Sequence, residues 1–141
     1  MDTEQIVIER TYNVSVDTVW RALTDIAQIN EWFFKLEDFK PEVGFSFSFS
    51  GNDGGTVVVH ECVVKEVIAG KKLAYSFIYS GYPGDSLVTY ELFAEGEGTK
   101  LVLTHSNLEN MLNGSPMFAR EKFVGGWTYL TGKLKNFLEK E

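Results

Sequence analysis

Two histidines and a single cysteine are the side chains of this sequence best suited to metal binding or nucleophilic chemistry. His60 and Cys62 stand two positions apart in one stretch, and His105 stands in another. A tetrahedral zinc site needs three or four ligands that meet at one point, and the two strands carrying these residues need not be neighbours. A nucleophilic cysteine needs a cationic neighbour or a helix N-terminus, whereas Cys62 lies in an apolar stretch. We therefore expect no metal, no cofactor and an unreactive Cys62.

Acid–base chemistry is the alternative use of His105, paired with a tyrosine. General acid–base catalysis requires both groups within hydrogen-bond reach of the substrate, which sequence spacing alone does not establish. No glycine-rich phosphate loop, Ser-His-Asp order or HExxH stretch occurs. The GNDGG segment at 51–55 is predicted to be a hairpin turn, because no helix pattern follows it. We name no catalytic residue and favour a protein that is not an enzyme, with the His105 pair left open.

Alternating residues mark the strands that must position these groups. Between Val43 and Ser50 the sequence reads VGFSFSFS. Alternate side chains of a strand point to opposite faces, so the phenylalanines share one face and the serines the other. The same alternation gives each later strand an inward face. The expected inward residues are Phe45, Phe47, Phe49, Val58, His60, Cys62, Val64, Leu73, Tyr75, Phe77, Tyr79, Val88, Tyr90, Leu92, Leu101, Leu103 and His105.

The predicted order of elements is one strand, two short helices, five strands and one long helix. Strand patterns cover 5–12, 43–50, 56–67, 72–80, 86–95 and 99–107. Helical patterns cover 16–23, 26–32 and 116–138. The WFF segment at 32–34 is too apolar for an exposed loop. Gly125 and Gly126 each cost about 1 kcal/mol relative to alanine inside a helix, which we interpret as a close backbone approach or a bend.

These elements predict an α+β fold in which one long helix covers a six-stranded antiparallel sheet. Such a sheet twists and curls. A single helix about 10 Å across cannot fill a strongly curved sheet along its whole length. We therefore expect a cavity between the sheet and the C-terminal helix.

The inward face has the composition of a small-molecule pocket, a mostly apolar lining with a few polar groups that orient a ligand. The alternative is a filled core in which each tyrosine hydroxyl and histidine nitrogen finds a backbone partner. On the last helix, Arg120 lies one turn before Phe123 and could close the pocket mouth. The candidate ligand-binding residues are Trp32, Phe45, Phe47, Phe49, His60, Tyr75, Phe77, Tyr79, Tyr90, Leu103, His105, Arg120, Phe123 and Trp127.

Several short segments, taken in order, resemble one family over nearly the whole chain. They are VWRALTD (19–25), EWF (31–33), Val43-Gly44 before Phe45 and Phe47, LAY (73–75), VTYEL (88–92), TKLVLTH (99–105), Gly126-Trp127 and Leu130 through Leu134. The chain resembles the helix-grip, START-like superfamily called SRPBCC, and within it homologues of the activator of heat-shock protein 90 ATPase. The resemblance implies a deep hydrophobic cavity between sheet and C-terminal helix. One departure is IAGK (68–71), where the family commonly has prolines, and it affects a turn rather than the cavity.

The leading prediction is non-enzymatic binding of a small hydrophobic or aromatic molecule in that cavity. The resemblance implies two alternatives. One is a co-chaperone-like activator of a heat-shock protein 90 ATPase, with a role in the stress response. The other is an enzyme like the polyketide cyclases and aromatases, with His105 as acid–base group.

The length of the chain bears on the number of domains, and its charge on the kinds of partner it can bind. The 141 residues predict one domain, 1–141, and 44% hydrophobic residues are ample for a packed core. A net charge of −7 disfavours nucleic acid and anionic membranes, and no apolar run approaches the roughly 18 residues of a membrane span. The N-terminus lacks signal-peptide features, and a single cysteine suits a reducing compartment. We expect a cytoplasmic monomer or weak homodimer whose partner is a small hydrophobic molecule or a chaperone.

Overall fold

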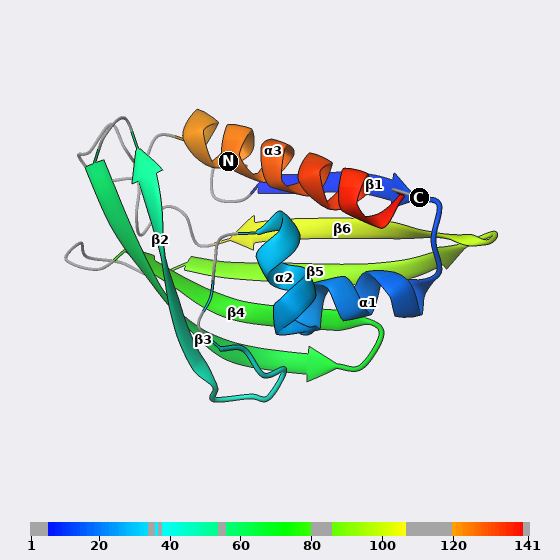
Figure 1. Ribbon diagram of the computed structural model, residues 1–141, viewed down its shortest axis with the longest axis horizontal. Helices are drawn as coiled ribbons and strands as arrows, with labels where there is room; N and C mark the ends of the chain where they lie inside the picture. The colour runs from blue at the N-terminus through cyan, green and yellow to red at the C-terminus, as the bar shows by residue number, and fades with distance from the viewer. Residues whose placement is uncertain are drawn as a thin grey trace.

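In the part of the chain that the structure describes, six antiparallel strands form one curved sheet, and three helices lie on its concave side (Figure 1). The computed structural model describes residues 6–33, 36, 38–53, 56–79, 86–106 and 120–139. For residues 51–53, 56–58, 79 and 120–123 it describes the backbone alone. The α+β helix-grip architecture expected from the sequence is confirmed.

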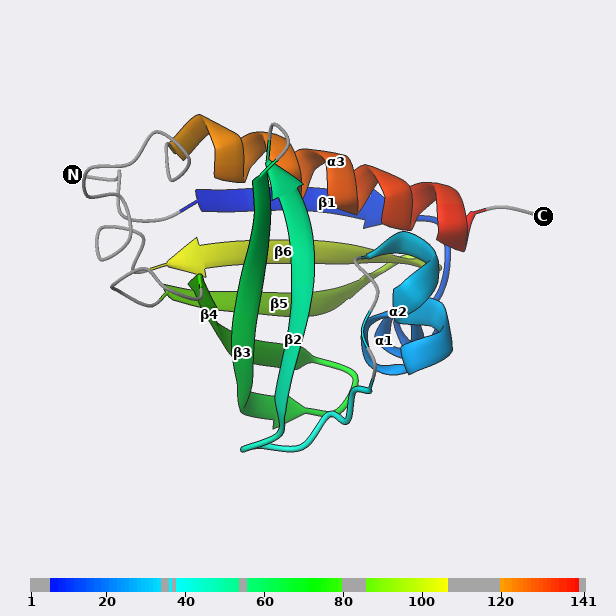
Figure 2. The same cartoon turned by 60° about the vertical axis from the view of Figure 1, so that its left-hand side comes forward.

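The strand order across the sheet is β1-β6-β5-β4-β3-β2, and every neighbouring pair is antiparallel. The strands are β1 (Ile6–Tyr12), β2 (Ser46–Asp53), β3 (Thr56–Ile68), β4 (Lys72–Tyr79), β5 (Ser86–Glu95) and β6 (Gly98–Ser106). In Figure 2, β2 and β3 cross the direction of β5 and β6. The far edge of the sheet therefore turns toward the helices and encloses the interior from a second side.

The helices are α1 (Val16–Thr24), α2 (Ile26–Trp32) and α3 (Arg120–Leu138). Ser15 caps α1 by accepting a hydrogen bond from the Thr18 amide at 3.3 Å. The Trp32 indole nitrogen donates to the Ala22 carbonyl at 2.9 Å and joins α2 to α1. No helix in the described ranges is both long and apolar enough to span a membrane.

Side chains of β1 attach the long helix α3 to the edge of the sheet. Arg10 Nε donates to Thr131 Oγ1 at 3.1 Å, and the Tyr12 hydroxyl donates to the Thr131 carbonyl at 3.2 Å. Tyr12 is fully buried. Because a buried hydroxyl without a partner is costly, these bonds fix where α3 lies along β1.

A tight turn determines where β2 begins. Gly44 has φ +94°, which residues with a side chain rarely adopt. The Phe45 amide donates to the Glu42 carbonyl at 3.0 Å and closes the turn. The strand therefore begins at Ser46, three residues later than predicted, and runs to Asp53. A hairpin connects β2 and β3 within the predicted segment 51–55, but residues 51–53 continue the pairing with β3 as far as Asp53 and Thr56, so the connection is shorter than predicted.

The glycines in α3 correct a second expectation. A Cβ built on Gly125 or Gly126 meets no atom of the described residues within 4 Å, and both residues are exposed. Neither glycine is therefore required by close packing against the sheet. The predicted start of this helix at 116–119 lies outside the described residues.

Replacing Gly125 or Gly126 with alanine is expected to raise the free energy of unfolding by about 0.5–1 kcal/mol each, because alanine loses less backbone entropy on folding. Gly98→Ala is the control, because it is expected to lower the free energy of unfolding instead of raising it. Its Cβ would lie 2.5 Å from the Tyr12 carbonyl oxygen, and such overpacking costs about 1–3 kcal/mol. Urea denaturation measures all three variants. A loss of stability in both helix variants would contradict the open surroundings of these glycines.

Candidate ligand-binding site

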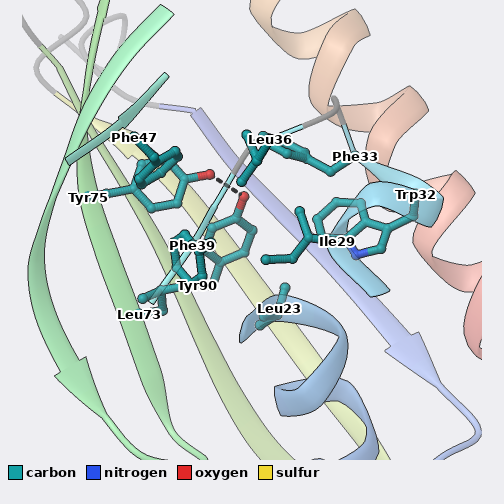
Figure 3. Close-up of a pocket in the computed structure, with 10 residues that line it drawn as sticks. All are labelled: Leu23, Ile29, Trp32, Phe33, Leu36, Phe39, Phe47, Leu73, Tyr75 and Tyr90. Carbon is teal, nitrogen blue, oxygen red and sulfur yellow. Dashed lines mark hydrogen bonds between the residues drawn. The ribbon is translucent and has the colours of Figure 1, made fainter. Parts of the chain in front are cut away.

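A small hollow lies between the concave face of the sheet and helices α1 and α2 (Figure 3). Among the described residues it is lined by six aromatic and four aliphatic side chains, none of them charged. The lining residues are Leu23, Ile29, Trp32, Phe33, Leu36, Phe39, Phe47, Leu73, Tyr75 and Tyr90. The cavity volume is about 20 Å³, room for about one water molecule. The hollow is thus on the concave side of the sheet, as the curvature argument predicted, but the helices that line it are α1 and α2, and no described residue of the C-terminal helix α3 lines it. It is also far smaller than a ligand.

Aromatic rings occupy most of the space that a bound molecule would need. The rings of Phe39 and Phe47 lie 5.1 Å apart edge to face, and Phe47 meets Tyr75 in the same way at 5.1 Å. Phe33 reaches Phe49 at 5.1 Å. Such pairs add about 0.5–1.5 kcal/mol each beyond the burial of their area. In this conformation the alternating phenylalanines of β2 therefore face packed rings.

Three apolar residues that lie outside the helices and strands narrow the hollow. Phe33, Leu36 and Phe39 follow α2 and precede β2, and each is less than 9% exposed. Asn30 on α2 holds this segment with two bonds, accepting from the Leu36 amide at 2.8 Å and donating to the Leu36 carbonyl at 3.3 Å. We call Phe33, Leu36 and Phe39 the plug. Its contacts with the sheet are side-chain contacts to β2, since no strand pairing includes it.

Two tyrosine hydroxyls are the polar groups that the hollow offers among its described lining, since the Trp32 indole nitrogen already donates to the Ala22 carbonyl. Tyr75 on β4 and Tyr90 on β5 are 3% and 2% exposed, and their oxygens lie 2.7 Å apart (Figure 3). Burial raises the pKa of both phenols well above the usual value. Both groups are therefore uncharged hydrogen-bond donors at neutral pH.

His105 belongs to a buried network beside the hollow, and the donors fix its protonation. The Trp127 indole nitrogen, which can only donate, bonds to His105 Nδ1 at 2.9 Å. The proton of the neutral ring is thus on Nε2, which donates to Ser86 Oγ at 2.7 Å, and Ser86 Oγ donates to the Phe77 carbonyl at 2.9 Å. Burial lowers the pKa of His105 to about 3. The network joins α3 to β6, β5 and β4.

The metal and thiol chemistry considered above has little support from the geometry. No group of three or more His, Cys, Asp or Glu that could hold an ion is found among the described residues. Two strands, β4 and β5, separate His60 on β3 from His105 on β6. Burial raises the pKa of Cys62, so the thiol stays protonated and is a poor nucleophile.

The residues predicted from sequence divide into three groups. Trp32, Phe47, Tyr75 and Tyr90 line the hollow. Phe49, His60, Phe77, Leu103, His105 and Trp127 are buried around it, and Phe45 is half-buried against Phe39. The side chains of Tyr79, Arg120 and Phe123 lie outside the described part of the structure, as does that of the inward candidate Val58.

Most of the lining that the prediction omitted comes from the helices and the plug. The omitted residues are Leu23, Ile29, Phe33, Leu36, Phe39 and Leu73. A signal existed, because apolar residues recur at 33, 36 and 39 in a segment with no strand alternation. Ser86 was also missed as the partner of His105, since a serine at a predicted strand start has no distinguishing pattern.

The curved sheet, the long α3 and the hollow on the concave side define a helix-grip protein, and solved structures share this architecture. Protein MLL2253 from Mesorhizobium loti is 30% identical, with a TM-score of 0.77 over 96% of this chain and 97% of that one. CalU16 from Micromonospora echinospora is 29% identical, with a TM-score of 0.73 over 96% of this chain and 76% of that one.

The family follows from a family model as well as from these structures. The model described as Activator of Hsp90 ATPase homolog 1-like protein matches residues 13–139. The chain belongs to this family, as the sequence resemblance indicated. DynU16, from the dynemicin biosynthetic locus, has the same fold at 23% identity and a TM-score of 0.78, over 97% of this chain and 48% of that one. No curated protein sequence matches the chain.

Proposed function

We propose that this protein binds a small, uncharged aromatic or hydrophobic molecule between the sheet and the helices and does not transform it. The observation that carries the proposal is the lining of the hollow. The ten lining side chains that the structure describes are uncharged, and their polar groups are chiefly one pair of tyrosine hydroxyls. An apolar enclosure with a few convergent polar groups is the usual composition of a small-molecule site.

Binding requires the plug to move, because a cavity of about 20 Å³ admits no ring. Phe33, Leu36 and Phe39 are held by side-chain packing, by the two bonds between Asn30 and Leu36, and by single bonds from the Phe33 amide to the Ile29 carbonyl and from the Phe39 amide to Asp38 Oδ1. No strand pairing of the described residues includes them. Segments without such pairing open at lower free energy than strands in a sheet. A ligand ring would replace the apolar contacts of the displaced plug, so part of the cost of opening is recovered.

Titration with naphthalene tests the proposal, with the methyl NMR signals of the lining as readout. Signals of Leu23, Ile29 and Leu73 are expected to shift, while that of exposed Val43 stays constant. Leu36→Ala enlarges the hollow at a cost of about 2–5 kcal/mol in stability. Filling the new space returns part of that cost, so the variant is expected to bind naphthalene about tenfold more tightly, a factor equal to about 1.4 kcal/mol.

Leu101→Ala is the matched control for this gain. Leu101 is fully buried on β6 but does not line the hollow, so its removal destabilises the protein without creating room for naphthalene there. Equal gains in the two variants would mean that any core void binds the probe. If no lining methyl shifts in either the original protein or Leu36→Ala, the proposal is wrong.

The catalytic alternative receives less support from the same geometry. Both nitrogens of His105 are engaged, one by Trp127 and one by Ser86. An imidazole that is neutral and saturated in this way would have to break a buried bond before it could accept a substrate proton. Activation of a chaperone stays a prediction that the family description suggests. Addition of this protein to a heat-shock protein 90 homologue, with ATP turnover measured, tests it directly.

A further inference from the structure

The Tyr75–Tyr90 hydroxyl pair has one more donor than its own bond uses. Each hydroxyl carries one proton, and a single hydrogen bond at 2.7 Å links the two oxygens. One hydroxyl proton therefore forms the bond between the two tyrosines. The proton of the other hydroxyl is available to a third group. In the described part of the chain, neither oxygen has a further protein partner. A buried donor without a partner costs about 1–3 kcal/mol, so this proton favours any acceptor that reaches it.

The available proton is directed into the hollow rather than toward solvent. Both tyrosines line the cavity and are at least 97% buried. Figure 3 shows their hydroxyl groups turned toward one another on the side of the hollow that faces α2 and the plug. The remaining lining side chains around them are apolar except for the Trp32 indole nitrogen, which already donates to the Ala22 carbonyl. The tyrosine pair is thus the place in the described lining where a ligand could form a hydrogen bond to a side chain.

We propose that this pair selects ligands with an uncharged acceptor oxygen on an aromatic ring system, such as an aryl ketone. This inference rests on the proposed function and specifies its ligand class. The ring of such a ligand takes the place of the plug, and its carbonyl oxygen accepts the available tyrosine proton. Pure hydrocarbons leave that donor unsatisfied. Carboxylates are disfavoured because a buried charge without a charged partner is costly, and none of the described lining residues is cationic.

The test compares two probes of nearly equal shape, 1-indanone and indane, which differ in the carbonyl. Dissociation constants are measured by methyl NMR on the original protein and on Leu36→Ala, which has more room. Tyr75→Phe and Tyr90→Phe are made singly and together in both backgrounds. The double variant, Tyr75→Phe with Tyr90→Phe, removes both hydroxyls of one hydrogen bond. It leaves no buried polar group without a partner, so it is expected to fold.

The double variant is expected to lose about fivefold in affinity for 1-indanone, within the range of one net hydrogen bond. Its affinity for indane is expected to stay level or rise. Either single variant keeps one donating hydroxyl and is expected to retain binding of 1-indanone. The carbonyl stretching band of bound 1-indanone should lie at a lower wavenumber in the protein with tyrosines than in the double variant.

The outcomes separate this inference from the proposed function. If indane and 1-indanone both bind and the double variant changes neither affinity, the hollow is a ligand site but the tyrosine pair does not select for an acceptor oxygen. An equal loss for both probes would point to a packing defect and would also overturn the inference. If neither probe shifts a lining methyl in any of the proteins, the proposed function fails as well.

Discussion

Trp127→Ala is expected to lower the free energy of unfolding by about 3–5 kcal/mol, the usual cost of removing a buried tryptophan. Trp127 is 4% exposed, and its ring lies about 6 Å from those of Phe33, Phe77, Tyr90 and His105. It is therefore the point where α3, the plug and the sheet meet. Its loss removes these contacts and also the donor to His105 Nδ1.

Two further variants divide this effect into its parts. Trp127→Phe keeps a ring but removes the donor, and loss of a partner for a buried acceptor costs about 1–3 kcal/mol. Tyr129→Ala is the matched control on the same helix, because Tyr129 is 65% exposed and its removal is expected to have little effect. Chemical denaturation with unchanged m-values measures all three. A cost for Trp127→Ala no larger than that for Tyr129→Ala would contradict the placement of this ring in the core.

Acidification is expected to destabilise the protein through His105 in particular. In the unfolded chain a histidine titrates near pH 6.5, whereas burial lowers the pKa of His105 to about 3 in the folded protein. Between these values the unfolded state binds a proton that the folded state does not. Stability is therefore full above about pH 6.5 and falls by about 1.4 kcal/mol per pH unit as the pH drops toward 3.

His105→Gln isolates this contribution, because an amide can accept from Trp127 and donate to Ser86 but does not titrate. The difference in unfolding free energy between the two proteins, from urea denaturation at several pH values, should be level above pH 6.5 and should slope below it. Carboxylates common to both proteins cancel in the difference. Nitrogen chemical shifts of His105 give a second measure, and the ring should stay neutral with its proton on Nε2 down to about pH 4. A level difference across the acid range would show that His105 is protonated in the folded state.

The plug connects these predictions to function. Trp127 stacks near Phe33 at 6.4 Å, and Phe33 contacts Phe49 on β2. A ligand that displaces the plug therefore exchanges one set of aromatic contacts for another. The hydrogen bonds of the His105 network are expected to stay in place during this exchange. Trp127 belongs to both parts of this core, because it donates to His105 in the network and its ring stacks on Phe33 of the plug.

A bulge in β3 shows where inward and outward faces could not be followed from sequence alone. The pairing with β4 shifts between Val64 and Glu66, so one extra residue stands on β3. Strict alternation from Val64 would turn Glu66 inward, but Glu66 is exposed and Val67 is half-buried against the core. Before the bulge, the predicted inward residues His60, Cys62 and Val64 are all buried.

The sequence by itself determined the elements, their order, the inward faces of the strands and the family. It could do so because alternate residues of a strand must face opposite sides and because a helix repeats every 3.6 residues. The buried positions Phe47, Tyr75, Tyr90 and His105 follow from that geometry alone.

Only the tertiary structure decided how much of the interior is empty and which buried groups meet. The apolar residues 33, 36 and 39 could be picked out from the sequence, but not their place against β2, where they leave a cavity of about 20 Å³. The hydroxyls of Tyr75 and Tyr90 meet because of the register of β4 and β5, and Ser86 reaches His105 because of the register of β5 and β6. Strand registers and cavity size depend on contacts between residues that are far apart in the chain. The pattern of residue types along the sequence does not contain the spatial distances between such residues.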